Sequence, residues 1–186
     1  MNDVPNRAAG ADLEKLAQVR LLALDVDGTL TDGRVIYPGL QSEIQRFDVR
    51  DGQGLRWLIE AGVTVAWITG RGCEATRRRA EELGIQELLT RSGPKRAALE
   101  ALQVRLGISR DETASMGDDV PDLGLAAGSG FFAAPSDACA PVREAAALVT
   151  NLPGGRGAVR ELCEEILRAK GVFESILENG LGPERG

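Results

Sequence analysis

The sequence contains no histidine among its 186 residues. This absence excludes serine–histidine–aspartate and cysteine–histidine catalysis, histidine phosphatases and metal centres ligated by imidazole. Acid–base chemistry must therefore fall to carboxylates, lysine or water. Cysteine is also scarce, because Cys73, Cys139 and Cys163 are far apart, odd in number and without zinc spacing. They indicate no disulfide framework, which is typical of a protein from the reducing cytosol.

Long apolar runs are missing as well. No segment approaches the roughly 18 to 20 apolar residues that a helix needs to cross a bilayer. The N-terminal segment has no apolar signal core, so we expect a cytoplasmic protein without a membrane partner. A hydrophobic share of 43% and a charged share of 27% favour one globular domain over residues 1–186, with flexible termini at residues 1–12 and 171–186.

Positive charge is in deficit, since 22 lysines and arginines face 28 acidic residues and the net charge is −6. Binding to nucleic acid needs a basic face, so a nucleic-acid partner is not expected. A small anionic substrate is not excluded, because a few arginines and a metal ion can outweigh the deficit locally.

Residues 21–33 read LLALDVDGTLTDG, a short apolar run that ends in carboxylates and glycines. The run predicts a buried parallel strand, with Asp25 and Asp27 on one side where the strand ends. Two acids in that place suit Mg²⁺ bridging to a phosphate. One carboxylate could attack phosphorus to form an aspartyl-phosphate, while the other moves the proton.

The rest of the chain alternates strand-like and helix-like segments, which predicts an α/β fold: a three-layer, doubly wound, Rossmann-like parallel sheet. Residues 34–37 and 43–47 flank a Pro-Gly turn and predict a small β-hairpin insertion. Residues 48–54 read as a charged loop before a helix over residues 55–61, and Asp12 as the cap of a lead-in helix. Ligands of such sheets bind at the carboxyl ends of the strands, where we expect Asp25, Thr69 and Asp118 to meet.

Four candidate motifs follow one another along the chain: DVDGTLTDG at residues 25–33, Thr69-Gly70-Arg71, Lys95, and GDDVPD at residues 117–122. Together they resemble the motifs of the haloacid dehalogenase superfamily of phosphotransferases. Many relatives have Asn or Asp before the lysine, where this chain has Pro94.

The resemblance implies a set of catalytic and metal-binding roles. Asp25 would be the nucleophile, Asp27 the general acid and base, Thr69 a ligand of the phosphoryl oxygens and Lys95 the neutralising cation. Mg²⁺ would be the cofactor, and the resemblance implies as its ligands Asp25, Asp27 through its carbonyl and Asp118, with Asp119 a ligand through water or a hydrogen-bond partner.

Between the first two motifs there is room for the hairpin only and no cap domain. FDVRDGQGLR at residues 47–56 and GGRGAVREL at residues 154–162 resemble the 3-deoxy-D-manno-octulosonate 8-phosphate phosphatases, a capless branch on the lipopolysaccharide route. That family implies a homotetramer acting on a phosphorylated keto sugar acid. It further implies substrate contacts from Asp27, Asp48, Val49, Arg50, Asp51, Gly52, Arg56, Arg71, Arg79 and Lys95.

Two other functions stay open: a sibling phosphatase for a nonulosonate 9-phosphate, and a catalytically silent oligomerisation module. The intact acids and Lys95 count against silence. Cys73 and Arg79 have the spacing of a cysteine-phosphatase loop, but bulky residues between them disfavour that function. Residues 154–157 lack the Lys-Ser/Thr ending of a nucleotide P-loop.

Overall fold

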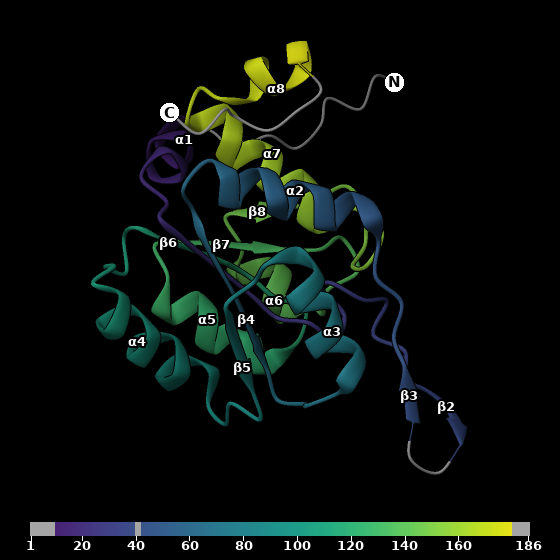
Figure 1. Cartoon of the computed structure of the whole chain (residues 1–186). Coiled ribbons are helices and arrows are strands. Elements are labelled where there is room, and N and C mark those ends of the chain that lie inside the picture. Colours follow the sequence, from purple (N-terminus) through teal and green to yellow (C-terminus); the bar gives the residue numbers. More distant parts are fainter. Residues whose placement is uncertain (1–9, 40–41, 180–186) are drawn as a thin grey trace.

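The computed structural model describes residues 10–39 and 42–179 (Figure 1). Its centre is a parallel six-stranded sheet in the order β5-β4-β1-β6-β7-β8. This order confirms the predicted doubly wound α/β fold, because the chain runs outward from β1 in both directions. The strands are β1 (Leu21–Leu24), β4 (Thr64–Thr69), β5 (Glu87–Thr90), β6 (Thr113–Met116), β7 (Phe131–Ala134) and β8 (Leu148–Val149).

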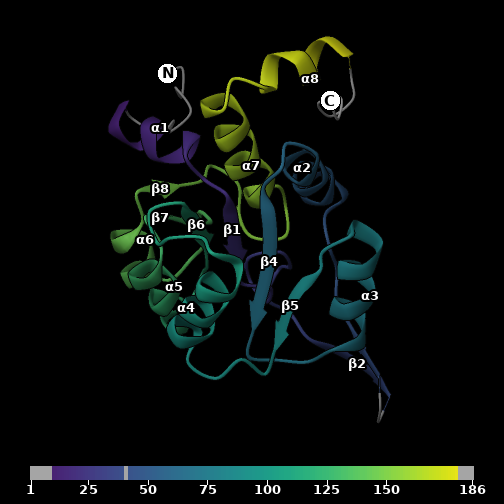
Figure 2. The same ribbon diagram turned by 60° about the vertical axis from the view of Figure 1, so that its left-hand side comes forward.

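Helices cover both faces of the sheet, as Figures 1 and 2 show. Alternate residues of β1 point to opposite faces: Leu22 and Leu24 pack in the core under α2 and α7, and Leu21 and Ala23 in the core under α4 and α5. The helices are α1 (Gly10–Ala17), α2 (Val49–Glu60), α3 (Glu74–Leu83), α4 (Lys95–Leu106), α5 (Leu123–Gly128), α6 (Ala140–Ala145), α7 (Ala158–Ala169) and α8 (Phe173–Asn179), with a 3₁₀ turn η1 (Val120–Asp122) before α5.

The predicted hairpin is present as β2 (Ile36–Gly39) and β3 (Ser42–Ile44), which pair antiparallel. It extends away from the body of the molecule (Figure 1). Among the described residues of the hairpin, the apolar side chains of Ile36, Tyr37 and Ile44 lie exposed, and Tyr37 is 70% exposed. The hairpin and α2 are the elements described between β1 and β4, so no cap domain stands there.

The prediction of a loop over residues 48–54 was wrong, because α2 already begins at Val49. Asp48 is its N-cap, and its Oδ1 accepts a hydrogen bond from the backbone N–H of Arg50 at 2.8 Å. The glycines in this stretch favoured the prediction of a loop. In the structure, Gly54 instead allows α2 to pack closely against α7. A Cβ on it would lie 2.9 Å from Cδ of Arg160 on α7.

One expectation about the N-terminal helix needs correction. Helix α1 begins at Gly10, so Asp12 lies in its first turn and is not its cap. Helix α8 lies within residues 171–186, the segment expected to be flexible. Its Phe173 and Ile176 are buried, and Cζ of Arg168 lies 4.3 Å from the centre of the Phe173 ring. Residues 1–9 and 180–186 lie outside the described residues. Among the described helices, none has the length and apolarity to cross a membrane.

Candidate active site

The carboxyl ends of β1, β4 and β6 surround a hollow of about 200 Å³. These three strands are neighbours in the sheet, and each ends at a motif that the sequence analysis singled out. The structure therefore brings together most residues expected to do chemistry. The hollow is lined by Asp25, Asp27, Thr69, Gly70, Arg71, Lys95, Asp118, Asp119, Pro121 and Asp122.

Lys95 links two buried carboxylates at the base of the hollow. It is the first residue of α4, and its Nζ donates hydrogen bonds to Oδ1 of Asp25 and to Oδ1 of Asp122. Burial alone would lower the pKa of Lys95, but the two carboxylates outweigh burial and raise it. The ammonium therefore stays charged beside Asp25. Pro94 is the N-cap of α4, so it suits the helix start without blocking Lys95.

Asp122 is a functional residue that the sequence analysis did not assign. Besides its contact with Lys95, its Oδ2 accepts hydrogen bonds from the backbone N–H groups of Asp118 at 3.0 Å and Asp119 at 3.1 Å. It thereby fixes the loop after β6 and the lysine together. The signal was available, because Asp119 and Asp122 have the spacing of a capping box.

Three carboxylates form the group that could hold a cation. Oxygens of Asp25, Asp118 and Asp122 lie within 4.8 Å of one another. Burial, and then the charge of Asp122, raise the pKa of Asp25 well above its usual range and that of Asp118 to about 6. A single ammonium does not balance this buried negative charge, whereas a divalent cation would. Hard carboxylate oxygens are the ligands that Mg²⁺ prefers, so these residues fit it.

Gly28 lets the first motif approach Asp118. Its φ is +103°, and a Cβ built on it would lie 2.2 Å from Oδ2 of Asp118. Thr29 on the same turn donates from Oγ1 to Oδ1 of Asp118 at 3.1 Å. Asp119, expected as a fourth ligand, lies outside the three-carboxylate group, and its exposed side chain caps η1 by accepting from the N–H of Val120.

The side chain of Asp27 faces the opposite wall of the hollow. Its Oδ2 accepts from Oγ1 of Thr69 at 3.1 Å, its Oδ1 accepts from Nε2 of Gln45 at 2.8 Å, and Nε of Arg71 lies 3.6 Å from Oδ1. Arg71 also pairs with Glu43 at 2.8 Å. The Asp27 carboxylate is thus held outside the three-carboxylate group, a place that suits a proton carrier. Gln45 and Glu43 were not anticipated from the sequence.

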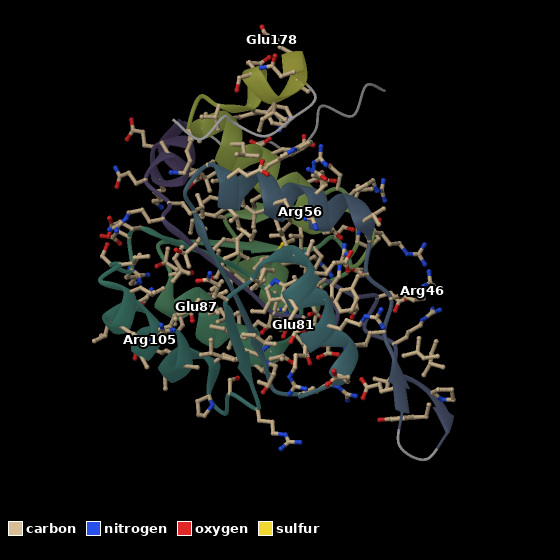
Figure 3. All side chains as sticks on the ribbon, in the orientation of Figure 1. Arg46, Arg56, Glu81, Glu87, Arg105 and Glu178 are labelled. Carbon is tan, nitrogen blue, oxygen red and sulfur yellow. The ribbon has the colours of Figure 1, made fainter. Side chains whose placement is uncertain are left out.

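The remaining expected substrate contacts do not line this hollow within one chain. Arg56, Arg79, Val49 and Gly52 line a second hollow of about 170 Å³ between α2 and α3. Figure 3 shows Arg56 projecting from α2, where it donates to the carbonyl of Glu82 on α3 at 2.9 Å. Val49 and Gly52 belong to this surface because α2 begins earlier than expected, whereas Arg56 on α2 and Arg79 on α3 line the hollow because the two helices pack side by side.

The charged residues at the start of α2 form hydrogen bonds and ion pairs that hold the N-terminal ends of α2 and α7. Arg50 pairs with Asp48 at 2.7 Å and donates to the carbonyl of Arg156 at 2.9 Å. Asp51 is only 1% exposed and accepts from the backbone N–H groups of Gly157 and Arg160, at the start of α7. Burial raises the pKa of Asp51 to about 6, since it opposes the charged form more than these bonds favour it.

The glycine-rich residues 154–157 support the first motif. Gly155 donates its N–H to the carbonyl of Thr29 at 3.0 Å, and a Cβ on Gly154 would lie 1.7 Å from the carbonyl oxygen of Gly28. Only glycine permits this approach, so the GGRG stretch holds the turn that carries Thr29. Residues 74–79 after Cys73 are helical, which leaves no loop to wrap an anion there.

Comparison with known proteins identifies the family. No family model matches the chain. The 3-deoxy-D-manno-octulosonate 8-phosphate phosphatase KdsC of Yersinia pestis is 40% identical over 163 residues, which cover 87% of each chain. This chain belongs to the 3-deoxy-D-manno-octulosonate 8-phosphate phosphatase family. The resemblance noted in the motifs is therefore confirmed.

Solved structures of the family share the fold. That of the Moraxella catarrhalis phosphatase, in complex with a magnesium ion, a phosphate ion and KDO, has a TM-score of 0.88 and 38% identity, and the match covers 91% of this chain and 97% of that one. The cobalt-bound form of the Haemophilus influenzae phosphatase has a TM-score of 0.86 and 36% identity, with coverages of 90% and 98%.

Proposed function

We propose that this chain hydrolyses 3-deoxy-D-manno-octulosonate 8-phosphate to the free sugar acid and phosphate, with Mg²⁺ as cofactor. The observation that carries the proposal is the buried pair of Asp25 and Lys95 beside Asp27, in a chain of this family. The relatives' substrate is a phosphorylated keto sugar acid of the lipopolysaccharide route. Three free cysteines support the cytoplasm as the compartment.

In the first half of the reaction, a carboxylate oxygen of Asp25 attacks phosphorus, and the bond from phosphorus to the sugar oxygen breaks. Asp27 gives its proton to the departing sugar oxygen. Thr69 lies 3.1 Å from Asp27, where its hydroxyl can also bind a phosphoryl oxygen. The charge of Lys95 favours the ionised form of Asp25 against the effect of burial, and it stabilises negative charge as phosphorus becomes five-coordinate.

In the second half, water attacks the phosphorus of the aspartyl-phosphate, and its proton passes to Asp27. The bond between phosphorus and Asp25 breaks, which restores the carboxylate of Asp25 and the protonated form of Asp27. When Mg²⁺ is bound, it offsets the negative charge shared by the phosphoryl group and the acids. Asp25 and Asp118 would hold it through their carboxylates and Asp27 through its carbonyl, while Asp122 keeps the loop and Lys95 in place.

The working enzyme is proposed to be a homotetramer. The catalytic hollow is open, and the arginines expected to contact the sugar acid line a separate hollow of the same chain. A neighbouring chain could bring such residues to the site. The exposed hairpin, with Ile36, Tyr37 and Ile44, offers apolar surface for that contact.

We therefore expect light scattering to give the mass of a tetramer. Ile36→Glu should shift the protein to smaller species, because a carboxylate in an apolar interface is costly. Val104→Glu is the matched control, since Val104 is exposed on α4 away from the hairpin. A monodisperse monomer that still prefers the sugar acid over p-nitrophenyl phosphate would contradict assembly as a condition of specificity.

Arg56, Arg71 and Arg79 are proposed to read the sugar acid beyond its phosphate. Each change to alanine should cost about 1.5–3 kcal/mol of transition-state binding with the sugar acid, as for other hydrogen bonds to charged groups. The cost with p-nitrophenyl phosphate, which has no carboxylate, should be much smaller. Arg77→Ala is the control, because Arg77 pairs with Glu74 on the exposed side of α3. Equal losses on both substrates would leave the three arginines a structural role only.

A panel of sugar-acid phosphates tests the proposed function. Phosphate release is measured with the octulosonate 8-phosphate, a nonulosonate 9-phosphate and p-nitrophenyl phosphate, each with Mg²⁺ and with EDTA. We expect the highest kcat/KM with the octulosonate ester. Preference for the nonulosonate ester would assign the chain to the sibling activity, and no turnover of any ester would indicate the silent module.

A further inference from the structure

Gln45 lies between Asp27 and helix α3. It follows β3 at the base of the hairpin, and none of the four motifs contains it. Its Nε2 donates to Oδ1 of Asp27 at 2.8 Å. On the other side, its Oε1 accepts from Oγ1 of Thr76 at 2.6 Å and from Sγ of Cys73 at 3.4 Å. One half-buried amide therefore connects the proposed proton carrier to the start of α3.

The chemistry of its neighbours gives this amide one orientation. A glutamine side chain offers an acceptor oxygen on one end and two N–H donors on the other. Oδ1 of Asp27 is an acceptor, whereas the hydroxyl of Thr76 and the thiol of Cys73 can donate. Turning the amide over would place its oxygen against the Asp27 carboxylate. Thr76 is 2% exposed, so its hydroxyl provides a rigid anchor.

A second side chain of the hairpin acts on the same carboxylate. Glu43 precedes Gln45 by two positions, a spacing that places both on one side of an extended segment. Glu43 pairs with Arg71 at 2.8 Å, and Nε of Arg71 lies 3.6 Å from Oδ1 of Asp27. The hairpin therefore reaches Asp27 directly through Gln45 and indirectly through Arg71.

We propose that Gln45 is a positioning residue that holds the Asp27 carboxylate for proton transfer and ties it to α3 through Thr76. This inference rests on the proposed function of Asp27. Because Gln45 donates to Oδ1, that oxygen is an acceptor while the bond exists. The proton that Asp27 gives to the leaving sugar is therefore carried by Oδ2. The partner of Oδ2 is the Thr69 hydroxyl at 3.1 Å, which can turn to accept a hydrogen bond, whereas the amide N–H of Gln45 can only donate.

The leaving group provides the test. A sugar alkoxide needs a proton as it departs, whereas p-nitrophenolate does not. With the full chain and Mg²⁺, Gln45→Leu should slow single-turnover release of the sugar acid roughly 10- to 100-fold, within the range of general acid catalysis. The burst of p-nitrophenolate should stay within about twofold of the original rate, since proton donation contributes little to that step.

The anchor and the controls make the test specific. Thr76→Val should give the same selective loss in smaller degree, and Thr76→Ser, which keeps the hydroxyl, should restore the rate. Gln86→Leu repeats the chemical change at an exposed position just before β5, at the far end of the sheet, and should alter neither rate. On an Asp27→Asn background, Gln45→Leu should add no further selective loss, because the group that it positions is gone.

The outcomes separate this inference from the proposed function. If Asp27→Asn slows sugar release selectively and Gln45→Leu does not, Gln45 positions nothing, although Asp27 keeps its role. Equal slowing of both substrates by Gln45→Leu would also overturn the inference, since that result indicates a general structural effect. If Asp27→Asn itself leaves sugar release intact, the proposed mechanism fails.

Discussion

Asp25→Asn is expected to reduce phosphate release by on the order of 10⁴-fold or more, as for the loss of other catalytic nucleophiles. A carboxamide has nearly the shape of a carboxylate but is a poor nucleophile. Lys95 keeps its second partner, Asp122, so the hollow should keep its form. Phosphate release from the octulosonate ester, with Mg²⁺ present, measures the effect.

Thermal unfolding distinguishes a loss of catalytic chemistry in Asp25→Asn from a loss of folded protein. Burial raises the pKa of Asp25, so the native state opposes its charge, and the neutral asparagine should leave Tm unchanged or higher. Asp111→Asn is the matched control, since Asp111 is exposed and lies just before the amino end of β6, whereas the candidate site lies at the carboxyl ends of the strands. Turnover by Asp25→Asn above a tenth of the original rate would exclude Asp25 as the nucleophile.

Removal of divalent cations is expected to abolish turnover, and Mg²⁺ should restore it. Asp25, Asp118 and Asp122 place three carboxylates within 4.8 Å, and Lys95 supplies the single ammonium bonded to two of them. Without a cation, an incoming phosphate meets this uncompensated negative charge. Dialysis against EDTA followed by titration with Mg²⁺ measures the dependence.

Binding can be followed apart from activity. A ligand that binds only the folded state raises Tm by mass action, so Mg²⁺ should stabilise the original protein. Asp118→Asn should weaken this stabilisation, while Asp111→Asn should not. Full turnover after exhaustive chelation, or equal Mg²⁺ stabilisation of Asp118→Asn and the original chain, would contradict the assignment of the metal group.

The sequence was informative where local chemistry decides structure. Short apolar runs that end in glycine and acidic residues predicted the main strands, because parallel strands buried on both faces are typically continuous apolar runs. Helix α4 ends before Gly107, a residue type that commonly follows a helix. Because the carboxyl ends of neighbouring parallel strands meet, Asp25, Thr69 and Asp118 could be placed together without knowledge of their side-chain contacts.

What escaped prediction depends on tertiary contacts. The start of α2 was missed because a glycine such as Gly54 weakens an isolated helix. The presence of a glycine at this position is explained only by the close approach of α7. Arg56 and Arg79 were expected from the family resemblance to contact the substrate, but the sequence does not show that they line a separate hollow of the same chain, because that depends on how α2 and α3 pack. Gln45 had no local signal, since its partners are distant in sequence and meet only in the fold.

The measurement closest to the central claim is to trap the covalent intermediate. The enzyme is mixed with 3-deoxy-D-manno-octulosonate 8-phosphate and Mg²⁺, quenched during turnover and reduced with borohydride, which converts an aspartyl-phosphate to homoserine. Peptide mass spectrometry should find homoserine at position 25, only when substrate was present. Phosphate release with no modified residue, or with homoserine at a position other than 25, would contradict the account.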